Sequence, residues 1–95
     1  MIINFNSSVL EKLWTTGDIS LLPSAYVHEV VEILTIMDAA EKATDLALLG
    51  GFKIDEYAPD NWAVTITVNS VEPVGSITCY FTRGNAHDVD LNVYD

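Results

Sequence analysis

The sequence predicts an α+β fold: an antiparallel sheet of about four strands with two main helices packed on one face. Two patterns support this. Apolar residues recur at helical spacing in the first half of the chain, and after residue 51 they alternate with polar residues, as in half-buried strands. Short turns between the alternating segments are typical of hairpins. The 95 residues, 49% of them hydrophobic, suffice for a single domain, 1–95, with its own core.

The first segments combine a short apolar stretch with a helix. We expect residues 2–5 to form an edge strand. Ser7 or Ser8 then caps a helix, with Glu11 three residues after Ser8 as a capping box, and Gly17 ends it. Its buried face comprises Val9, Leu10, Leu13 and Trp14.

A longer helix is expected to begin near Pro23 and to run through Ala40. Its apolar face comprises Val27, Val30, Val31, Leu34 and Met37. Ile33 and Ile36 widen this face, either as ordinary core or as a strip that meets a partner. A third, short helix is expected at 44–49, stopped by the glycines at 50 and 51.

The second half of the chain predicts four strands joined by turns. The strands are expected at 52–57, 62–69, 76–82 and 86–94. Pro73 and Gly75 punctuate a loop before the third strand, and residues 83–85 form a turn before the last.

Charge is the strongest global signal. Fourteen acids face four bases, giving a net charge of −10. A polyanion would be repelled and would find few cations to replace its counterions, so no general nucleic-acid binding is expected. The acids are dispersed along the chain, which indicates a solvated surface or a surface that meets a basic protein or peptide.

Metal and cofactor sites are not expected. Strand alternation places His87 and Asp88 on opposite faces, with Asp90 on the same face as Asp88, and the second histidine, His28, lies on a helix. No glycine-rich phosphate loop, serine elbow or zinc spacing is present. The single cysteine, Cys79, is expected to be a buried apolar residue on a strand.

The remaining residue signals concern packing and location. Trp14 and Trp62 are expected to anchor the core, because a base-stacking platform would need accompanying cations. No apolar run is long enough for a transmembrane helix, and the first residues lack the pattern of a signal peptide. We therefore expect a cytoplasmic protein without a membrane partner.

Five short segments, in order along the chain, resemble landmarks of one known family. They are Thr16-Gly17-Asp18, Met37-Asp38-Ala39-Ala40, Gly51-Phe52-Lys53-Ile54, Trp62 with Ile66, Val68 and Asn69, and the stretch from Gly84 through Asp88-Val89-Asp90-Leu91 to Tyr94. In these segments the chain resembles the HigB-type killer toxins of plasmid maintenance systems, in the RelE/ParE superfamily. The resemblance implies a RelE/ParE-like domain and a place in a toxin–antitoxin system.

The resemblance also implies an activity, because these toxins are ribosome-dependent endoribonucleases that cut mRNA during translation. The positions that match the family's basic residues differ here. Asp55 and Glu56 stand in the segment where the family has a histidine and a lysine, Ser76 and Tyr80 stand in place of two arginines, and Asp95 stands in place of the final histidine. Carboxylates at these positions would repel RNA phosphates.

Two functions follow as hypotheses. The first is a divergent HigB/RelE-like protein without ribonuclease activity, which binds an antitoxin-like or basic protein or associates with itself. The alternative is an active ribosome-dependent mRNA endonuclease, and whether the chain is an enzyme stays open. Its catalytic candidates would be Arg83, His87, Tyr80 and Tyr94 in new roles.

Overall fold

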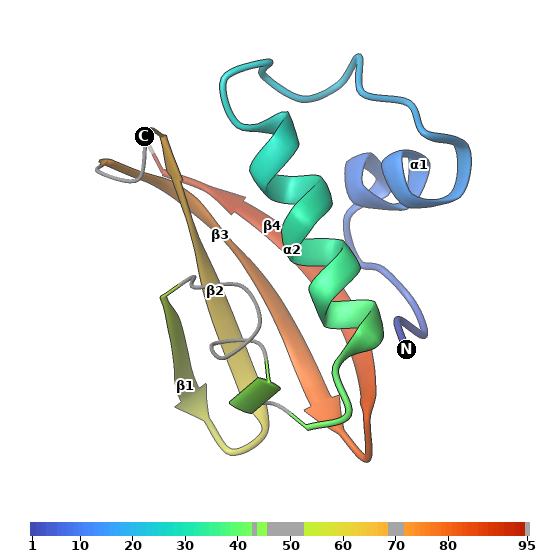
Figure 1. Ribbon diagram of the computed structural model, residues 1–95, viewed down its shortest axis with the longest axis vertical. Helices are drawn as coiled ribbons and strands as arrows, with labels where there is room; N and C mark the ends of the chain where they lie inside the picture. Colours follow the sequence, from blue (N-terminus) through green and yellow to red (C-terminus); the bar gives the residue numbers. More distant parts are fainter. Residues whose placement is uncertain (43, 46–52, 69–71, 95) are drawn as a thin grey trace.

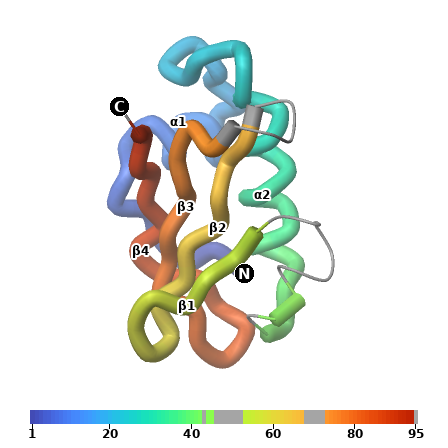
Figure 2. Tube along the Cα trace, turned by 90° about the vertical axis from the view of Figure 1, so that its left-hand side faces the viewer, coloured from blue at the N-terminus to red at the C-terminus, as the bar shows by residue number. Residues whose placement is uncertain are grey.

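A computed structural model describes residues 1–42, 44–45, 53–68 and 72–94. Its elements, in order, are α1 (Ser8–Thr16), α2 (Val27–Ala39), β1 (Ile54–Ala58), β2 (Asn61–Val68), β3 (Glu72–Thr82) and β4 (Asn85–Val93). The strands form one antiparallel sheet in the order β1-β2-β3-β4. Both helices lie on the same face of this sheet (Figures 1 and 2). The predicted α+β architecture is confirmed.

Helix α1 ends as predicted but is capped differently from the capping-box prediction. The Ser7 side chain caps the helix by accepting a hydrogen bond from the Leu10 N–H at 3.2 Å. Because Ser7 is the cap, Glu11 lies one residue too far along for a capping box, and the Ser8–Glu11 pairing is wrong. Gly17 adopts φ 75°, and its N–H donates to the Leu13 carbonyl at 3.0 Å, which closes the helix.

Helix α2 begins at Val27, later than the predicted start near Pro23. Residues 24–26 form turns, in which the Tyr26 N–H donates to the Pro23 carbonyl at 3.3 Å. Leu22 and Tyr26 are buried in the core. The segment before the helix therefore contributes to packing, and the first helical turn that proline favours does not form there.

The buried face of α2 is rotated from the predicted one. The buried residues are Val30, Ile33, Leu34 and Met37. Val31, predicted to be buried, is 39% exposed, while Ile33 is 1% exposed and Ile36 packs partly buried against the core. Ile33 is therefore an ordinary core residue, which is the first of the two interpretations that the sequence left open.

The core fills the space between the two helices and the sheet. From the sheet it receives Val64, Ile66, Ile77, Cys79, Phe81, Ala86 and Val89. Cys79 is buried on β3, as predicted. Trp62 packs partly buried against this core, but Trp14 is 36% exposed, so its predicted anchoring role is wrong. On α1, Leu10 and Leu13 are buried in the core, and Val9 packs partly buried against it, as predicted.

The loop predicted at Pro73 and Gly75 is wrong, because both residues lie within β3. The pairing of β2 with β3 shifts register between Ile66 and Thr67, beside the proline that lacks an N–H. Gly75 is buried, and a Cβ at this position would overlap the backbone carbonyl of Asn92 on β4. Here glycine allows close strand approach within a strand.

The other strands follow the predictions within a few residues. β1 begins at Ile54, and the predicted start of this strand at residue 52 lies outside the described residues. So do most of the third helix predicted at 44–49 and the glycines at 50 and 51. Arg83 and Gly84 have φ angles of 53° and 78° and form a two-residue hairpin loop between β3 and β4.

The first residues lie along the outer edge of β4. Ile2 and Phe5 form isolated parallel bridges with Ala86 and Val89. The N–H groups of Ile3 and Asn6 donate to the same two residues' carbonyls, each at 2.8 Å. The predicted edge strand at 2–5 is therefore reduced to two bridges.

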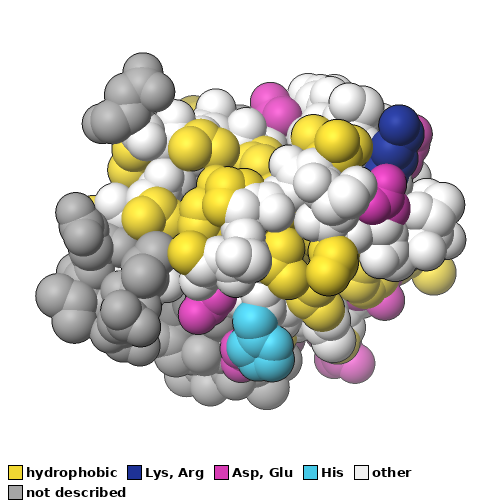
Figure 3. All heavy atoms as spheres, turned by 90° about the horizontal axis from the view of Figure 1, so that it is seen from above, with side chains coloured by type: hydrophobic (Ala, Val, Ile, Leu, Met, Phe, Trp, Pro, Cys, Tyr) yellow, Lys and Arg dark blue, Asp and Glu magenta, His cyan; other side chains and the backbone are white. Residues whose placement is uncertain are grey.

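Hydrophobic side chains are exposed at one end of the molecule. The segment between α1 and α2 forms this end (Figure 1), and its Ile19 and Leu21 side chains are 55% and 51% exposed. Figure 3 looks onto this end and shows hydrophobic side chains gathered across it, with charged side chains and a histidine toward the margin. In the described part of the chain, neither helix has the length and apolar character needed to cross a membrane.

Candidate binding site on the open sheet face

Among the described residues, one face of the sheet carries no helix, and Figure 2 shows this face in front of α1 and α2. Val64 and Ile77 are paired and point into the core, so their strand neighbours point to the open face. The register pairs Asn61 with Tyr80, Ala63 with Thr78, Tyr80 with His87 and Thr78 with Asp90. A continuous polar and aromatic strip therefore crosses β2, β3 and β4 on this face.

A cavity of about 290 Å³ lies along this strip. Two tyrosines, Tyr57 and Tyr80, and two carboxylates, Asp88 and Asp90, line it. The other lining residues are Asn6, Asn61, Thr78 and Cys79. The cavity thus combines aromatic rings, negative charge and neutral hydrogen-bonding groups from β1, β2, β3, β4 and the N-terminal segment.

A bulge in β4 brings the two carboxylates to the same cavity. Ala86 and Val89 are both fully buried although three positions apart, where regular alternation would require an even spacing. Asp88 is the extra residue, with φ 54°, between the pairs Tyr80–His87 and Thr78–Asp90. The shared face of Asp88 and Asp90 is as predicted, but the strict alternation assumed for His87 and Asp88 is wrong.

Asn4 holds the bulge in place. Its Oδ1 accepts a hydrogen bond from the Asp88 N–H at 2.7 Å, and its Nδ2 donates to Asp88 Oδ1 at 3.3 Å. Asparagine and aspartate tolerate such local geometry better than bulkier residues. Asn6, two residues later, lines the cavity itself. The sequence interpretation missed Asn4 and Asn6, and no local signal pointed to either.

Each of the two carboxylates has one oxygen without a hydrogen-bond donor among the described residues. Asp88 Oδ1 accepts from Asn4, and Asp90 Oδ1 accepts from the Leu91 N–H at 2.9 Å. Within the described residues, no donor is hydrogen-bonded to the Oδ2 atom of either side chain. An ionised carboxylate is an acceptor through both of its oxygens. Each Oδ2 atom is therefore an acceptor without a donor among the described residues, on a side chain that lines the cavity.

The four predicted catalytic candidates do not form one site. Tyr80 and His87 are cross-strand neighbours, with ring centroids 6.1 Å apart and planes tilted by 55°. Arg83 lies in the hairpin loop before β4, and Tyr94 follows the last residue of β4. The nine residues of β4 lie between Arg83 and Tyr94, and at the usual rise of a strand they span roughly 30 Å. Only Tyr80 of the four lines the cavity.

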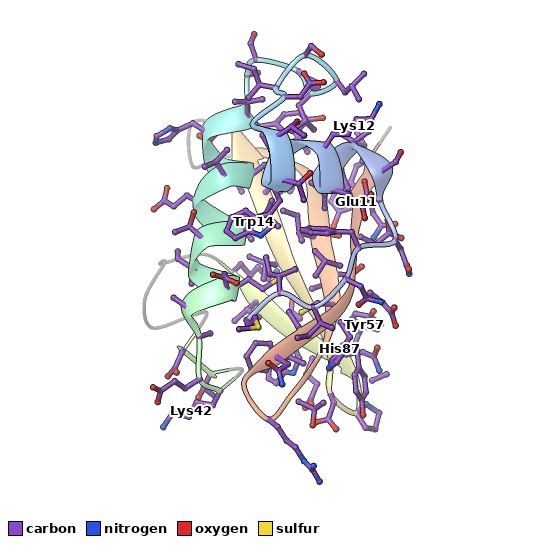
Figure 4. The ribbon with its side chains drawn as sticks, turned by 90° about the vertical axis from the view of Figure 1, so that its right-hand side faces the viewer. Glu11, Lys12, Trp14, Lys42, Tyr57 and His87 are labelled. Atoms are coloured by element: carbon purple, nitrogen blue, oxygen red, sulfur yellow. The ribbon has the colours of Figure 1, made fainter. Side chains whose placement is uncertain are left out.

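The lysine and arginine side chains do not line the cavity. Lys12 on α1 and Lys42 after α2 lie at opposite ends of the molecule (Figure 4). Lys53 is exposed just before β1, and Arg83 is exposed in the hairpin loop. None of these four, the only lysines and arginines in the sequence, lines the cavity. A phosphate there would meet two carboxylates without a compensating cation.

Metal binding and thiol chemistry find no support at the cavity. Among the described residues, no three His, Cys, Asp or Glu side chains come together in a group suited to a metal ion. Burial raises the pKa of the Cys79 thiol to about 12. The thiol therefore stays protonated near neutral pH and is a poor nucleophile.

Comparisons with known proteins add no relative. No protein-family model matches the chain, and no curated protein matches it either. The resemblance to the HigB-type toxins therefore stays a prediction that depends on the sequence landmarks.

Proposed function

We propose that this chain is a divergent HigB/RelE-like protein of the toxin–antitoxin type, which binds a basic protein through the open sheet face and lacks ribonuclease activity. One observation carries the proposal: the cavity on that face is lined by Asp88 and Asp90 and by none of the four basic residues. Ribonucleases need groups that tolerate or stabilise the negative charge of a reacting phosphate. This surface instead favours positive charge.

The register supports the link to the toxin family's site. The resemblance matches Ser76 and Tyr80 to arginines and places Asp55 in the segment with the histidine and lysine. These three residues pair with Thr65, Asn61 and Ala63, alternate residues of β2 that share the open face. These three substituted positions thus fall on one face of the sheet, and their side chains carry no positive charge, whereas Glu56 pairs with Trp62 on the other face and Asp95 lies outside the described residues. The absence of positive charge at these three positions supports a family member without the family's catalytic chemistry.

The partner is inferred from charge. A net charge of −10 at neutral pH steers basic molecules toward the surface and repels acidic ones. An antitoxin-like or otherwise basic protein fits this field better than a second copy of the chain, and we place the interaction in the cytoplasm.

The enzyme alternative has one observation in its favour. Tyr80 and His87 lie side by side, and a phenol and an imidazole are both competent in proton transfer. Arg83, the candidate for charge stabilisation, does not line the cavity. A divergent endonuclease would have to bind RNA without a cation at this surface, so we rank this function second.

Cleavage of mRNA on translating ribosomes, mapped by primer extension, tests the proposal against its alternative. We expect no specific cuts even at a large excess of purified protein. His87→Ala serves as the matched variant: specific cuts by the natural protein that vanish in this variant would establish the enzyme and refute the proposal.

The binding role needs its own experiment. The tagged protein is used to retain partners from a native lysate, with size-exclusion chromatography of the protein alone. We expect a basic protein to be retained at low salt and released as salt rises, because screening weakens exposed charge pairs. No retained basic protein, together with a monomer on sizing, would remove the binding role.

A further inference from the structure

We infer that the cavity on the open sheet face is a receptor site for an arginine side chain presented by a basic polypeptide. The inference deepens the protein-binding role proposed above by naming the chemical group that enters the site. It is argued from the size of the cavity, its two carboxylates, its tyrosine rings and the rigidity of its β4 wall.

Size favours a single side chain. The cavity measures about 290 Å³. Sites for drug-sized ligands and cofactors usually occupy about 300–1,000 Å³ and are lined mainly by apolar groups. Here the lining is mostly polar and the volume lies at the lower limit. Such a cavity suits the end of one long side chain better than a whole cofactor.

The carboxylates select a cation with several donors. Asp88 and Asp90 each have an Oδ2 atom with no hydrogen-bond donor among the described residues, while their Oδ1 atoms are occupied. A guanidinium carries five N–H donors in a fixed plane, so it can reach more than one acceptor at once. Thr78 and Asn61 line the same cavity and add neutral acceptors for its remaining N–H groups.

The tyrosines favour a flat cation over a compact one. Tyr57 is 61% and Tyr80 is 39% exposed, and both line the cavity. A guanidinium stacks on an aromatic ring by cation–π and planar contact, whereas a lysine ammonium is compact and strongly hydrated. The rings also distinguish this site from a cluster of acidic residues alone, because such a cluster would attract any cation equally.

The charged wall is held in place before a ligand arrives. Asn4 bonds both the backbone and the side chain of Asp88. The Leu91 N–H fixes the Asp90 carboxylate at 2.9 Å. Because these side chains are already oriented, binding would cost little ordering entropy on the protein's side.

Titration of the ¹⁵N-labelled protein with the blocked tripeptide Gly-Arg-Gly, followed by NMR, tests the inference. We expect saturable shifts at the amides of Asn61, Thr78, Tyr80, Asp88 and Asp90. The same peptide with citrulline, which has nearly the same shape without the charge, should bind roughly tenfold more weakly or worse. Gly-Lys-Gly should also bind more weakly than Gly-Arg-Gly.

Matched variants separate the site from bulk charge. Asp88→Asn and Asp90→Asn keep the Oδ1 acceptors used by Asn4 and Leu91, so the fold should persist while each weakens arginine binding by roughly tenfold. Asp55→Asn removes one charge from the same sheet face but not from the cavity, so binding should barely change.

Four results would overturn the inference: no saturable shift, equal binding of the arginine and citrulline peptides, lysine binding at least as tight as arginine, or an equal loss in Asp55→Asn and Asp90→Asn. The tripeptide titration needs no natural partner, so its result is independent of the lysate experiment. Arginine binding without any retained protein would keep this site and remove the proposed function. A retained basic protein without any binding of the arginine tripeptide would keep the proposed function and remove this site.

Discussion

The Asp38 side chain on α2 accepts a hydrogen bond from the Ile2 backbone N–H, with 2.9 Å between Oδ1 and N. The bond joins the N-terminal segment to the last turn of the long helix, 36 positions away in sequence. Ile2 also bridges to Ala86 at the start of β4. One carboxylate thus fixes the segment whose next residues, Asn4 and Asn6, build a wall of the cavity.

Asp38→Ala should therefore destabilise the protein by about 1–3 kcal/mol, since it leaves a half-buried N–H without its charged acceptor. Urea unfolding gives this difference. Asp38→Asn keeps an acceptor oxygen and should lose less. Equal losses in the two variants would mean that the carboxylate's charge, rather than its hydrogen bond, matters.

Asp88→Gly should be less destabilising than Asp88→Ala. Both changes remove the side-chain bond from Asn4, but the backbone φ of 54° costs alanine about 1–2 kcal/mol that glycine avoids. Chemical denaturation of the two variants measures the difference. Equal stability, or a more stable alanine variant, would show that residue 88 does not adopt the left-handed conformation.

Substitution by alanine should reduce the stability of the protein to different extents at two glycines. At Gly17 an added Cβ meets nothing within 4 Å, so Gly17→Ala should cost only the strain of φ 75°, about 1–2 kcal/mol. At Gly75 the Cβ would overlap the Asn92 carbonyl, which belongs to a neighbouring strand and cannot move aside cheaply. In thermal melts, the melting temperature of Gly75→Ala should lie well below that of Gly17→Ala. The opposite order would contradict the strand assignment of residue 75.

The orientation of α2 can be tested with two truncations. Leu34→Ala removes a side chain with no exposure and should cost about 2–5 kcal/mol. Val31→Ala, on the same helix but 39% exposed, should cost much less, about 1 kcal/mol or below. Similar losses would mean that the helix is rotated toward the face predicted from sequence.

The buried thiol predicts a stability change at alkaline pH. Burial raises the pKa of Cys79 from 9.0 to about 12. Below the lower value both states hold the proton; between the two values the unfolded chain releases it and the folded chain does not. The folded state therefore loses stability as pH rises through this window, by up to about 1.4 kcal/mol per pH unit.

Cys79→Ala is the control for that effect, since it lacks the titrating group but keeps the other ionisable residues. The difference in unfolding free energy between the natural protein and this variant should shrink as pH rises above 9.0. A difference that is independent of pH would show that the thiol is not shielded. Iodoacetamide should also modify Cys79 slowly in the folded protein near neutral pH.

Local sequence signals determined the fold class, the end of α1 at Gly17, the burial of Cys79 and a turn at 83–85, of which Asn85 proves to be the first residue of β4. Each is a backbone preference or a periodicity confined to neighbouring residues, so it can be predicted from the local sequence. The acidic character of the surface also follows from composition alone. At the candidate site, the sequence predicted the shared face of Asp88 and Asp90, but not the cavity.

The tertiary structure decided what depends on distant residues. Ile33 rather than Val31 faces the core, because the sheet fixes the rotation of α2. Gly75 lies in a strand because Asn92 on β4 approaches it closely. Asp88 interrupts the regular alternation of side chains along β4, and Asn4, 84 positions earlier, accepts the hydrogen bond from its backbone N–H. Register, bulges and the cavity they form arise from contacts between segments, and a pattern read within one segment does not contain them.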